Sequence, residues 1–293
     1  MRRAGVLFIK SLFLLILNIL LFPDAGYSWG PGVHILHGTH VLNGLNLLAP
    51  WLAKLLAEYS WDYLYGCISA DIFIGKGQKR RDDHCHNWSV GQNMLSKAKK
   101  SSHQAFTFGY LSHLAADIIA HNFYVPNQLY LTPSTRRLGH LYWEVRSDEY
   151  IAEKYWVLAR EVLERYNNDN DHLLQAIIPD KLIPFRTKKE IYQGVVRLHE
   201  LGRWQRSVTH IYQNASGGLS PQYIKYLLDL SIVLIINLLN NQEMALCLKY
   251  DPVGRDNLAA AKRLRRLARK NGSKRLTENI FTIPPEIHEL IPD

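Results

Sequence analysis

Apolar residues recur at helical spacing along most of the chain. The period is clear over residues 38–59, where Pro50 is well placed to open a second helix. No region is rich in the alternating pattern of strands, and neither an internal repeat nor a clear second domain is present. The pattern therefore predicts an all-α fold in a single multi-helical domain. Beyond the first two helices, we expect a short apolar element at 61–72, helices at 89–99, 102–123, 138–166, 188–213, 221–249 and 255–270, and loops at 75–83 and around Pro126, Asn127 and Pro133.

Two of the predicted helices have unusual compositions. Residues 226–239 are apolar, but the run is too short to span a membrane, and Asp229 and Asn237 interrupt it. We therefore expect a buried core helix there. Residues 255–275 carry nine basic residues and one acidic residue. A solvated helix face is the default interpretation of this basic segment, and a membrane-surface patch is the alternative.

The N-terminus has the composition of a secretory signal peptide. Three basic residues flank a short apolar core at 11–22, and residues 26–28 present the small side chains that a signal peptidase reads. The core is shorter than the roughly 20 residues of a membrane span, and an uncleaved anchor is the alternative. We therefore predict a signal peptide at 1–28, a helical domain at 29–293, and a secreted or periplasmic protein. Cleavage at this point would make Trp29 the first residue of the mature chain.

The net charge of the chain indicates which binding partners suit it, and its cysteine content limits the disulfides it can form. The formal charge is +9, and it becomes +7 once the leader is removed, because the leader holds three basic residues and one acidic residue. A basic exported protein suits anionic membranes or phosphorylated substrates. The three cysteines are an odd number and form no CxxC pair, which excludes a complete disulfide framework. Cys67 and Cys85 are the candidate pair for a single disulfide.

The most informative motif is a polar series inside the apolar helix predicted at 102–123. His113, Asp117 and His121 follow one another at four-residue spacing. On an α-helix these positions fall within about 80° of arc and span about 12 Å. Burying three such side chains without partners is expensive, because each loses its water and gains nothing. A cluster of metal ions would satisfy all three.

Similar chemistry recurs elsewhere in the first half of the chain. His140 and Glu144 again share a helix face, His86 lies in a polar loop before a helix, Asp71 ends the run CISAD, and His40 begins the first predicted helix. Any one pair of these residues could be structural, since thirteen histidines produce some four-residue spacings by chance. The complete set, in this order, favours metal ligands. Histidine and carboxylate are the ligands expected of a catalytic zinc site.

The order and spacing of these motifs resemble the zinc-dependent phospholipase C family. This family has the fold of the secreted bacterial phospholipases C, and a related module begins glycosylphosphatidylinositol-specific phospholipase D. The run YLSHLAAD is very similar to the GLASHMAAD-type helix of that module. The resemblance covers roughly residues 29–149. It implies an all-helical domain whose cleft holds three zinc ions.

The resemblance also implies a role for each candidate ligand. The mature N-terminal tryptophan of the family binds one zinc through its own amine and carbonyl, and Trp29 matches that residue. Asp117 looks like the carboxylate that bridges neighbouring ions. The implied ligand sets are Trp29, His40 and Asp117 for one zinc; Asp71, His86, His113 and Asp117 for a second; and His121, His140 and Glu144 for a third.

Two of these assignments have alternatives in the sequence. His34 and His37 compete with His40, which we prefer because a Thr-His pair opening a helix is the family pattern. His84 competes with His86, which we prefer for the tryptophan two places later. The short spacing from Asp117 to His121 agrees with the phospholipase D relative and indicates a divergent branch.

Clustered zinc ions suit phosphate ester cleavage, because they neutralise the phosphodiester charge and lower the pKa of a bound water. Asp71 would orient that water or take its proton, which makes it the candidate catalytic residue. We expect phospholipase C-type hydrolysis of phospholipids by a protein that binds the membrane surface peripherally. Neither Ile72 nor Asp83 supplies the ring expected for choline recognition, so no preference for phosphatidylcholine is implied.

Two other functions fit the same motifs. One is a zinc-dependent nuclease or another phosphoesterase on this fold. The final ligand of the implied set is Glu144, and a glutamate at this position matches the lipases rather than the nucleases. We therefore expect no nucleic-acid partner. The other is a non-catalytic, zinc-stabilised protein that binds membranes through its basic face.

Overall fold

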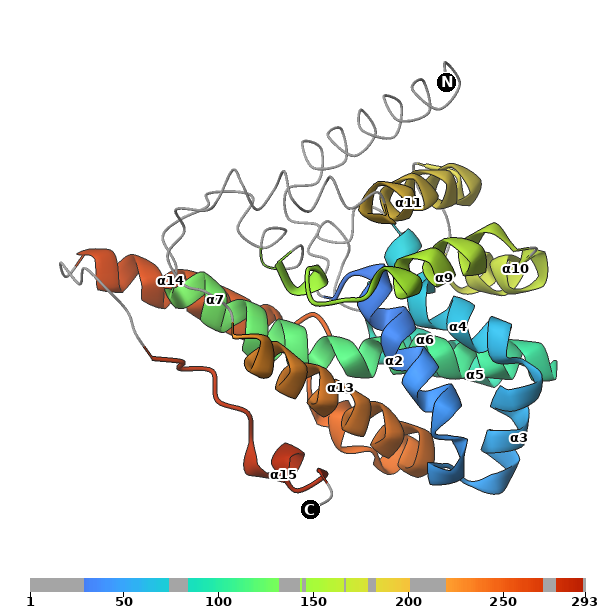
Figure 1. Ribbon diagram of the computed structural model, residues 1–293, viewed down its shortest axis with the longest axis horizontal. Helices are drawn as coiled ribbons and strands as arrows, with labels where there is room; N and C mark the ends of the chain where they lie inside the picture. The colour runs from blue at the N-terminus through green and yellow to red at the C-terminus, as the bar shows by residue number, and fades with distance from the viewer. Residues whose placement is uncertain are drawn as a thin grey trace.

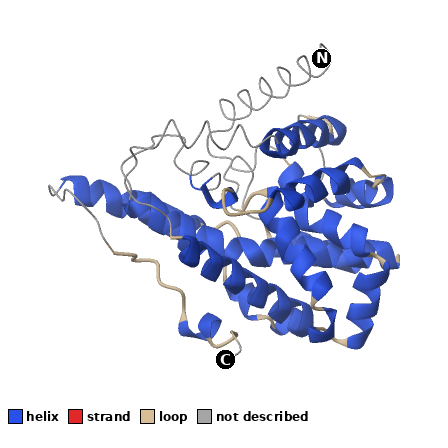
Figure 2. Cartoon of the chain, in the orientation of Figure 1, coloured by secondary structure: helices blue, strands red, loops and turns tan. Residues whose placement is uncertain are grey.

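The computed structural model describes residues 29–73, 84–131, 143, 146–165, 167–178, 183–200, 220–270 and 278–291. In these ranges every regular element is helical and no strand occurs (Figures 1 and 2). The prediction of an all-α fold is therefore confirmed. The predicted signal peptide at 1–28 and the predicted loop at 75–83 lie outside the described residues.

The helices follow one another along the chain, and the longest intervals between described helices separate α7 from α9 and α11 from α13. Most α-helices were expected from the apolar period, and Pro50 occupies the first turn of its helix as predicted. The elements are α2 (Pro31–Asn43), η1 (Leu45–Leu47), α3 (Pro50–Glu58), α4 (Ser60–Ser69), η2 (Ala70–Ile72), α5 (Trp88–Lys97), α6 (Ser101–Ile119), the π-helix η5 (Ala120–Tyr124), α7 (Val125–Leu131), α9 (Glu153–Glu164), α10 (Asn168–Ile177), α11 (Phe185–Glu200), α13 (Pro221–Asn241), η7 (Gln242–Met244), η8 (Leu246–Lys249), α14 (Arg255–Lys270) and α15 (Pro285–His288).

Helix α6 lies at the centre of the fold. Every residue from Ala105 to Ile119 is buried, and α6 packs against α4, α13, α5 and α2 (Figure 1). A helix that is apolar on all sides gains by being surrounded, since no face needs water. His113 and Asp117 are consequently carried into the interior with the rest of the helix.

Two glycines allow α4 and α6 to cross at very short range. A Cβ atom at Gly66 would lie 1.9 Å from the Phe106 carbonyl oxygen, and one at Gly109 would lie 2.0 Å from the Tyr63 carbonyl oxygen. Only glycine permits this approach, because any side chain would collide with the facing backbone. The crossing brings the end of α4, and with it Asp71, against the middle of α6.

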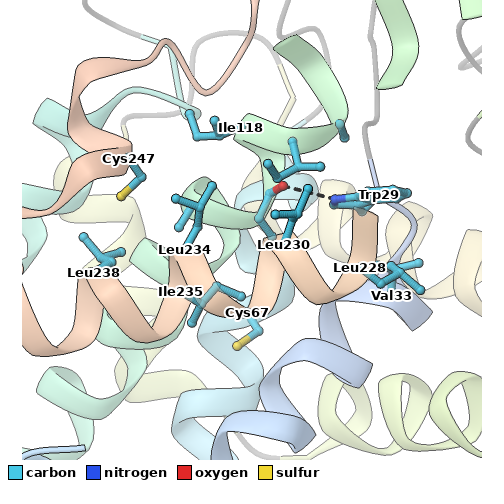
Figure 3. Close-up of a cluster of buried hydrophobic side chains, with 14 of the residues drawn as sticks. Trp29, Val33, Cys67, Ile118, Leu228, Leu230, Leu234, Ile235, Leu238 and Cys247 are labelled. Atoms are coloured by element: carbon cyan, nitrogen blue, oxygen red, sulfur yellow. Dashed lines mark hydrogen bonds between the residues drawn. The ribbon is translucent and has the colours of Figure 1, made fainter. Parts of the chain in front are cut away.

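Helix α13 covers another side of α6. By length and composition alone, residues 221–244 could cross a membrane. In the fold, however, one side of α13 is buried against α6 and α2, with Leu230, Leu234 and Leu238 in the core. Figure 3 shows this contact, with Trp29 packed beside the first turns of α13. A fully buried helix was expected, so the prediction of a core helix is confirmed for one side of α13 and is wrong for the other, which is only partly covered.

Several local predictions were wrong. Pro126 and Asn127 lie within α7 rather than in a loop, because the chain passes from α6 through the π-helix directly into α7. The helix predicted at 138–166 is interrupted by a turn before α9 begins at Glu153. Helix α10, which buries only a narrow face, was not predicted at all. The three cysteines are buried and unbridged, so the candidate disulfide between Cys67 and Cys85 is absent.

Candidate metal centre

Four buried side chains from three separate segments converge beside the centre of α6. His113 and Asp117 come from α6, Asp71 from η2 at the end of α4, and His86 from the turn before α5. All four are at most 2% exposed. The Gly66–Gly109 crossing positions Asp71. The Tyr110 hydroxyl positions the His86 turn by donating a hydrogen bond to the Cys85 carbonyl.

Five separations between donor atoms of these four residues lie near the ligand–ligand distance expected around a zinc ion. Two ligands about 2.05 Å from a tetrahedral zinc ion are about 3.3 Å apart. The observed separations surround that value, so the set predicted for the second zinc is brought together with spacings that suit zinc. The separations are His86 Nε2–His113 Nε2 2.9 Å, His86 Nε2–Asp71 Oδ1 3.3 Å, His86 Nε2–Asp117 Oδ2 3.3 Å, His113 Nε2–Asp117 Oδ2 3.3 Å and His113 Nε2–Asp71 Oδ1 3.8 Å.

A backbone contact fixes the tautomer of His113. Its Nδ1 donates a hydrogen bond to the Cys67 carbonyl at 2.9 Å. The neutral ring then has its lone pair on Nε2, the atom that faces His86 and Asp117. Histidines that bind metals usually have this second contact, which holds the ring in place. The chain is therefore arranged to present His113 Nε2 as a ligand.

The electrostatics also favour the metal-binding protonation states. Burial by itself raises the pKa of Asp117, but the neighbouring His113 and His34 outweigh this effect and hold the pKa well below its ordinary value. Burial lowers the pKa of His34, with a further contribution from His113. Asp117 is thus charged and His34 neutral near pH 7, and these are the forms that bind metal ions.

The histidine that α2 contributes to the cluster is His34, not His40. His34 Nε2 lies 3.3 Å from Asp117 Oδ1, and the ring stacks on His113 with centroids 3.8 Å apart. His37 is also buried, edge-on to Trp29 at 6.5 Å, whereas His40 is exposed. Because α2 begins at Pro31, His40 is six residues beyond His34 and turned about 240° away from it. The preference for His40 was therefore wrong about which face of α2 is buried.

Of the two candidate histidines before α5, His84 and His86, it is His86 that lies against Asp71 and Asp117. His84 is buried as well, but its Nδ1 accepts a hydrogen bond from the His86 backbone N–H at 3.1 Å. This contact closes the turn and aims the His86 ring at α6. His84 therefore helps to form the turn, and with Cys85 and His86 it also belongs to a group of buried side chains close enough to hold a metal ion.

Trp29 lies against the same stretch of α6. Its side chain is fully buried, and the indole N–H donates to the Ala116 carbonyl at 3.1 Å (Figure 3). The ring stacks on Tyr124 with centroids 5.5 Å apart. These contacts place the predicted first residue of the mature chain next to Asp117. Its role as a metal ligand stays a prediction.

The third predicted ligand set is only partly described. His121 is buried in the π-helix, and its Nδ1 donates to the Pro252 carbonyl at 2.5 Å, which leaves the lone pair on Nε2. π-helical turns of this kind often mark functional sites. His140 and Glu144 lie outside the described residues.

The sequence profile of the family described as zinc-dependent phospholipase C matches residues 33–198, more than half of the chain. The chain belongs to this family. The matched region contains His34 and the four-residue cluster, and it ends before α13 and α14 begin. No curated protein and no solved structure matches the chain significantly.

Membership of the zinc-dependent phospholipase C family and the His/Asp cluster point to the same chemistry. Two overlapping triads, His34–Asp71–His113 and His86–His113–Asp117, have donor atoms close enough to hold metal ions. Together with the family match, they indicate a zinc-dependent hydrolase of the phospholipase type. The contribution of His34 is the main feature that sequence spacing did not identify, although its burial follows from the apolar residues Val33, Val41 and Ile35 around it.

Proposed function

We propose that this protein is an exported zinc-dependent phosphodiesterase that hydrolyses phospholipids in the manner of a phospholipase C. The observation that carries the proposal is the convergence of His86, His113, Asp71 and Asp117, at spacings that suit zinc, in a member of this family. Zinc bound there would polarise the phosphodiester and lower the pKa of a water molecule toward neutrality. The products would be diacylglycerol and a phosphorylated headgroup.

The chain's own residues divide the remaining work. Asp71 has two carboxylate oxygens, so it can face the metal through one and hold a water molecule or take its proton through the other. His113 keeps its Nε2 lone pair in place through the Cys67 carbonyl. Asp71 is therefore our candidate catalytic residue, and His113 and His86 are ligands.

Asp117 is suited to join two metal ions. Its Oδ2 faces His86 and His113, each at 3.3 Å, while its Oδ1 faces His34 at 3.3 Å. The two oxygens thus serve two groups of imidazoles. We infer that a neighbouring zinc is bound by Asp117 and His34, with Trp29, and that a third is bound by His121, His140 and Glu144.

Export and membrane contact complete the proposal. The composition of residues 1–28 supports removal of a leader, which would free the amine of Trp29. The basic character of the chain supports peripheral binding to an anionic membrane surface. N-terminal sequencing of protein recovered from the medium or the periplasm tests the first point. A chain that still begins before Trp29 would contradict it.

The decisive experiment measures zinc content and product release on the same purified protein. We expect about three zinc ions per chain and release of diacylglycerol from vesicles of zwitterionic and anionic phospholipids. His113→Ala should lose zinc and activity, while the exposed control Glu161→Gln in α9 should keep both. Cleavage of single-stranded DNA without diacylglycerol release would favour the nuclease alternative. Full zinc occupancy without any hydrolysis would favour the non-catalytic alternative.

A further inference from the structure

Among the described residues, one buried acidic side chain lies outside the zinc ligand sets. Asp148 is 2% exposed, and within the described part of the chain its Oδ1 forms no hydrogen bond. The nearest base is His199, whose Nε2 is 3.8 Å from Asp148 Oδ2. Burial raises the pKa of Asp148 well above its ordinary value, and Glu149 adds to the effect. A carboxylate buried in this way is costly unless a donor or a cation meets it.

Within the described part of the chain, the neighbouring ionisable side chains do not supply that partner. His199 donates through Nδ1 to the Val195 carbonyl at 2.9 Å, and burial lowers its pKa, so the ring is neutral. Arg146 is paired with Glu149 at 2.6 Å. A neutral imidazole at 3.8 Å is too distant for a hydrogen bond. Among the described residues, no ionisable side chain therefore donates a hydrogen bond to Asp148 Oδ1.

The backbone of Gly30 is what faces Asp148. A Cβ atom at Gly30 would lie 2.4 Å from Asp148 Oδ1 and 2.6 Å from Oδ2, so both carboxylate oxygens point at this residue. Gly32 is held equally closely, since its Cβ would lie 2.6 Å from the Trp156 ring. The nitrogen of Trp29 is within about 5 Å of the Gly30 Cα by backbone dimensions. The carboxylate thus lies within reach of the predicted start of the mature chain.

We propose that Asp148 forms a binding site for the α-amino group of Trp29 that removal of the leader creates. This inference rests on the proposed cleavage after Ser28. In the longer chain, the Trp29 nitrogen is a neutral peptide group with one N–H, which compensates a buried carboxylate poorly. A free amine has additional N–H donors, and it retains two of them for Asp148 when its lone pair is given to a metal ion. Asp148 is then a positioning residue for the N-terminal ligand.

The test is a cycle that combines chain length with substitution at Asp148. Four zinc-loaded proteins are compared: chains that start at Trp29 or at Tyr27, each with Asp148 or with Asp148→Asn. We expect Asp148→Asn to lower the Tm of the chain starting at Trp29 by about 5 °C or more, and to change that of the longer chain much less. The control Asp171→Asn removes a carboxylate paired with Lys189 and should lower both Tm values equally.

A chemical variant keeps the test decisive if Asp148→Asn does not fold. Acetylation of the α-amine on the chain starting at Trp29 leaves an amide with one N–H and no available lone pair, without changing a side chain, and it should lower the Tm by a similar amount. Equal effects of Asp148→Asn on both chain lengths, or no effect of acetylation, would overturn the proposal. Zinc content is measured in parallel. If Asp148→Asn lowers the Tm equally in both chain lengths while the zinc content stays constant, only the Asp148 site is contradicted. If none of the four proteins contains zinc, the proposed enzyme is contradicted.

Discussion

Helices α6 and α14 both carry ionisable side chains, yet the fold treats them in opposite ways. In α6, the side chains of His113 and Asp117 are at most 1% exposed, and both contact other buried polar side chains. In α14, Lys262, Arg263 and Arg266 are exposed, and the helix contacts the protein mainly along α7 (Figure 1). One helix is surrounded, and the other lies at the edge of the molecule.

The difference shows which charges in a sequence indicate a site. A charge that the apolar pattern forces into the core must be compensated there, so its neighbours reveal its function. A charge on an amphipathic helix with one buried stripe is already satisfied by water. Ala261 is buried in such a stripe of α14, and Arg265 donates to the Leu129 carbonyl at 3.2 Å. The basic face of α14 fits both a solvated surface and a membrane patch.

The largest effect should come from breaking the helix crossing that surrounds α6. In Gly66→Ala, the new methyl group collides with the Phe106 carbonyl, so α4 and α6 must separate. We expect a loss of about 3 kcal/mol or more of unfolding free energy, and loss of zinc because Asp71 moves away. Thermal melting and zinc analysis measure both. Gly44→Ala, whose Cβ has its nearest contact at 3.3 Å, is the control. Equal melting of the two variants would contradict the crossing.

Removing a single buried charge in α6 should affect function more than stability. Asp117→Asn keeps the shape of the side chain but removes the carboxylate that faces both His34 and His113. We expect loss of at least one zinc ion and a fall in phospholipid hydrolysis of about 100-fold or more. The matched change Asp256→Asn on the exposed face of α14 should leave both properties unaltered. Retention of full activity in Asp117→Asn would remove this residue from the centre.

Acid should weaken the core while leaving the surface helix unaffected. Burial lowers the pKa of His34 and His37 below 6.5, so between those lowered values and 6.5 the unfolded chain binds more protons than the folded chain. Their contribution to stability is therefore complete above about pH 6.5 and declines as the pH falls below it. The depressed pKa of Asp117 extends the loss below pH 4.

Melting temperature and zinc content measured from pH 8 to pH 5 check this expectation. His37→Gln should reduce the fall in melting temperature between pH 8 and pH 5, because one buried ionisable ring is removed. The sequence of α14 contains no histidine, so the membrane-binding test below should be insensitive to the same change of pH. A melting temperature that stays constant down to pH 5 would refute the assignment of neutral, buried histidines.

The smallest effect on the folded state should come from the surface charges. Lys262→Gln combined with Arg266→Gln should change the melting temperature by less than about 2 °C and leave the zinc content unchanged. If the basic face contacts anionic lipids, the same double variant should bind vesicles containing phosphatidylserine about 10-fold or more weakly. Sedimentation with vesicles at low and high salt measures this. Unchanged binding would leave the face of α14 as a solvated surface.

Sequence spacing was sufficient for the parts of the centre that lie within one segment. The four-residue spacing of His113 and Asp117 places them on one face of α6 whatever the rest of the fold does, because helical geometry is local. The apolar surroundings of that pair then imply burial and partners. The all-helical class followed from the same periodicity, and the ligand chemistry of His86 and Asp71 could be anticipated from residue type and resemblance.

Tertiary structure decided which faces and segments meet. The choice of His34 over His40 depends on which side of α2 packs against α6, and that side is set by contacts distant in sequence. The approach of Asp71 to His113 depends on the helix crossing at Gly66. The contact between the Asp148 carboxylate and Gly30 depends on where the N-terminal segment lies. Local spacing determines which side chains share a face, but only long-range packing determines what that face meets, because burial is a property of the whole fold.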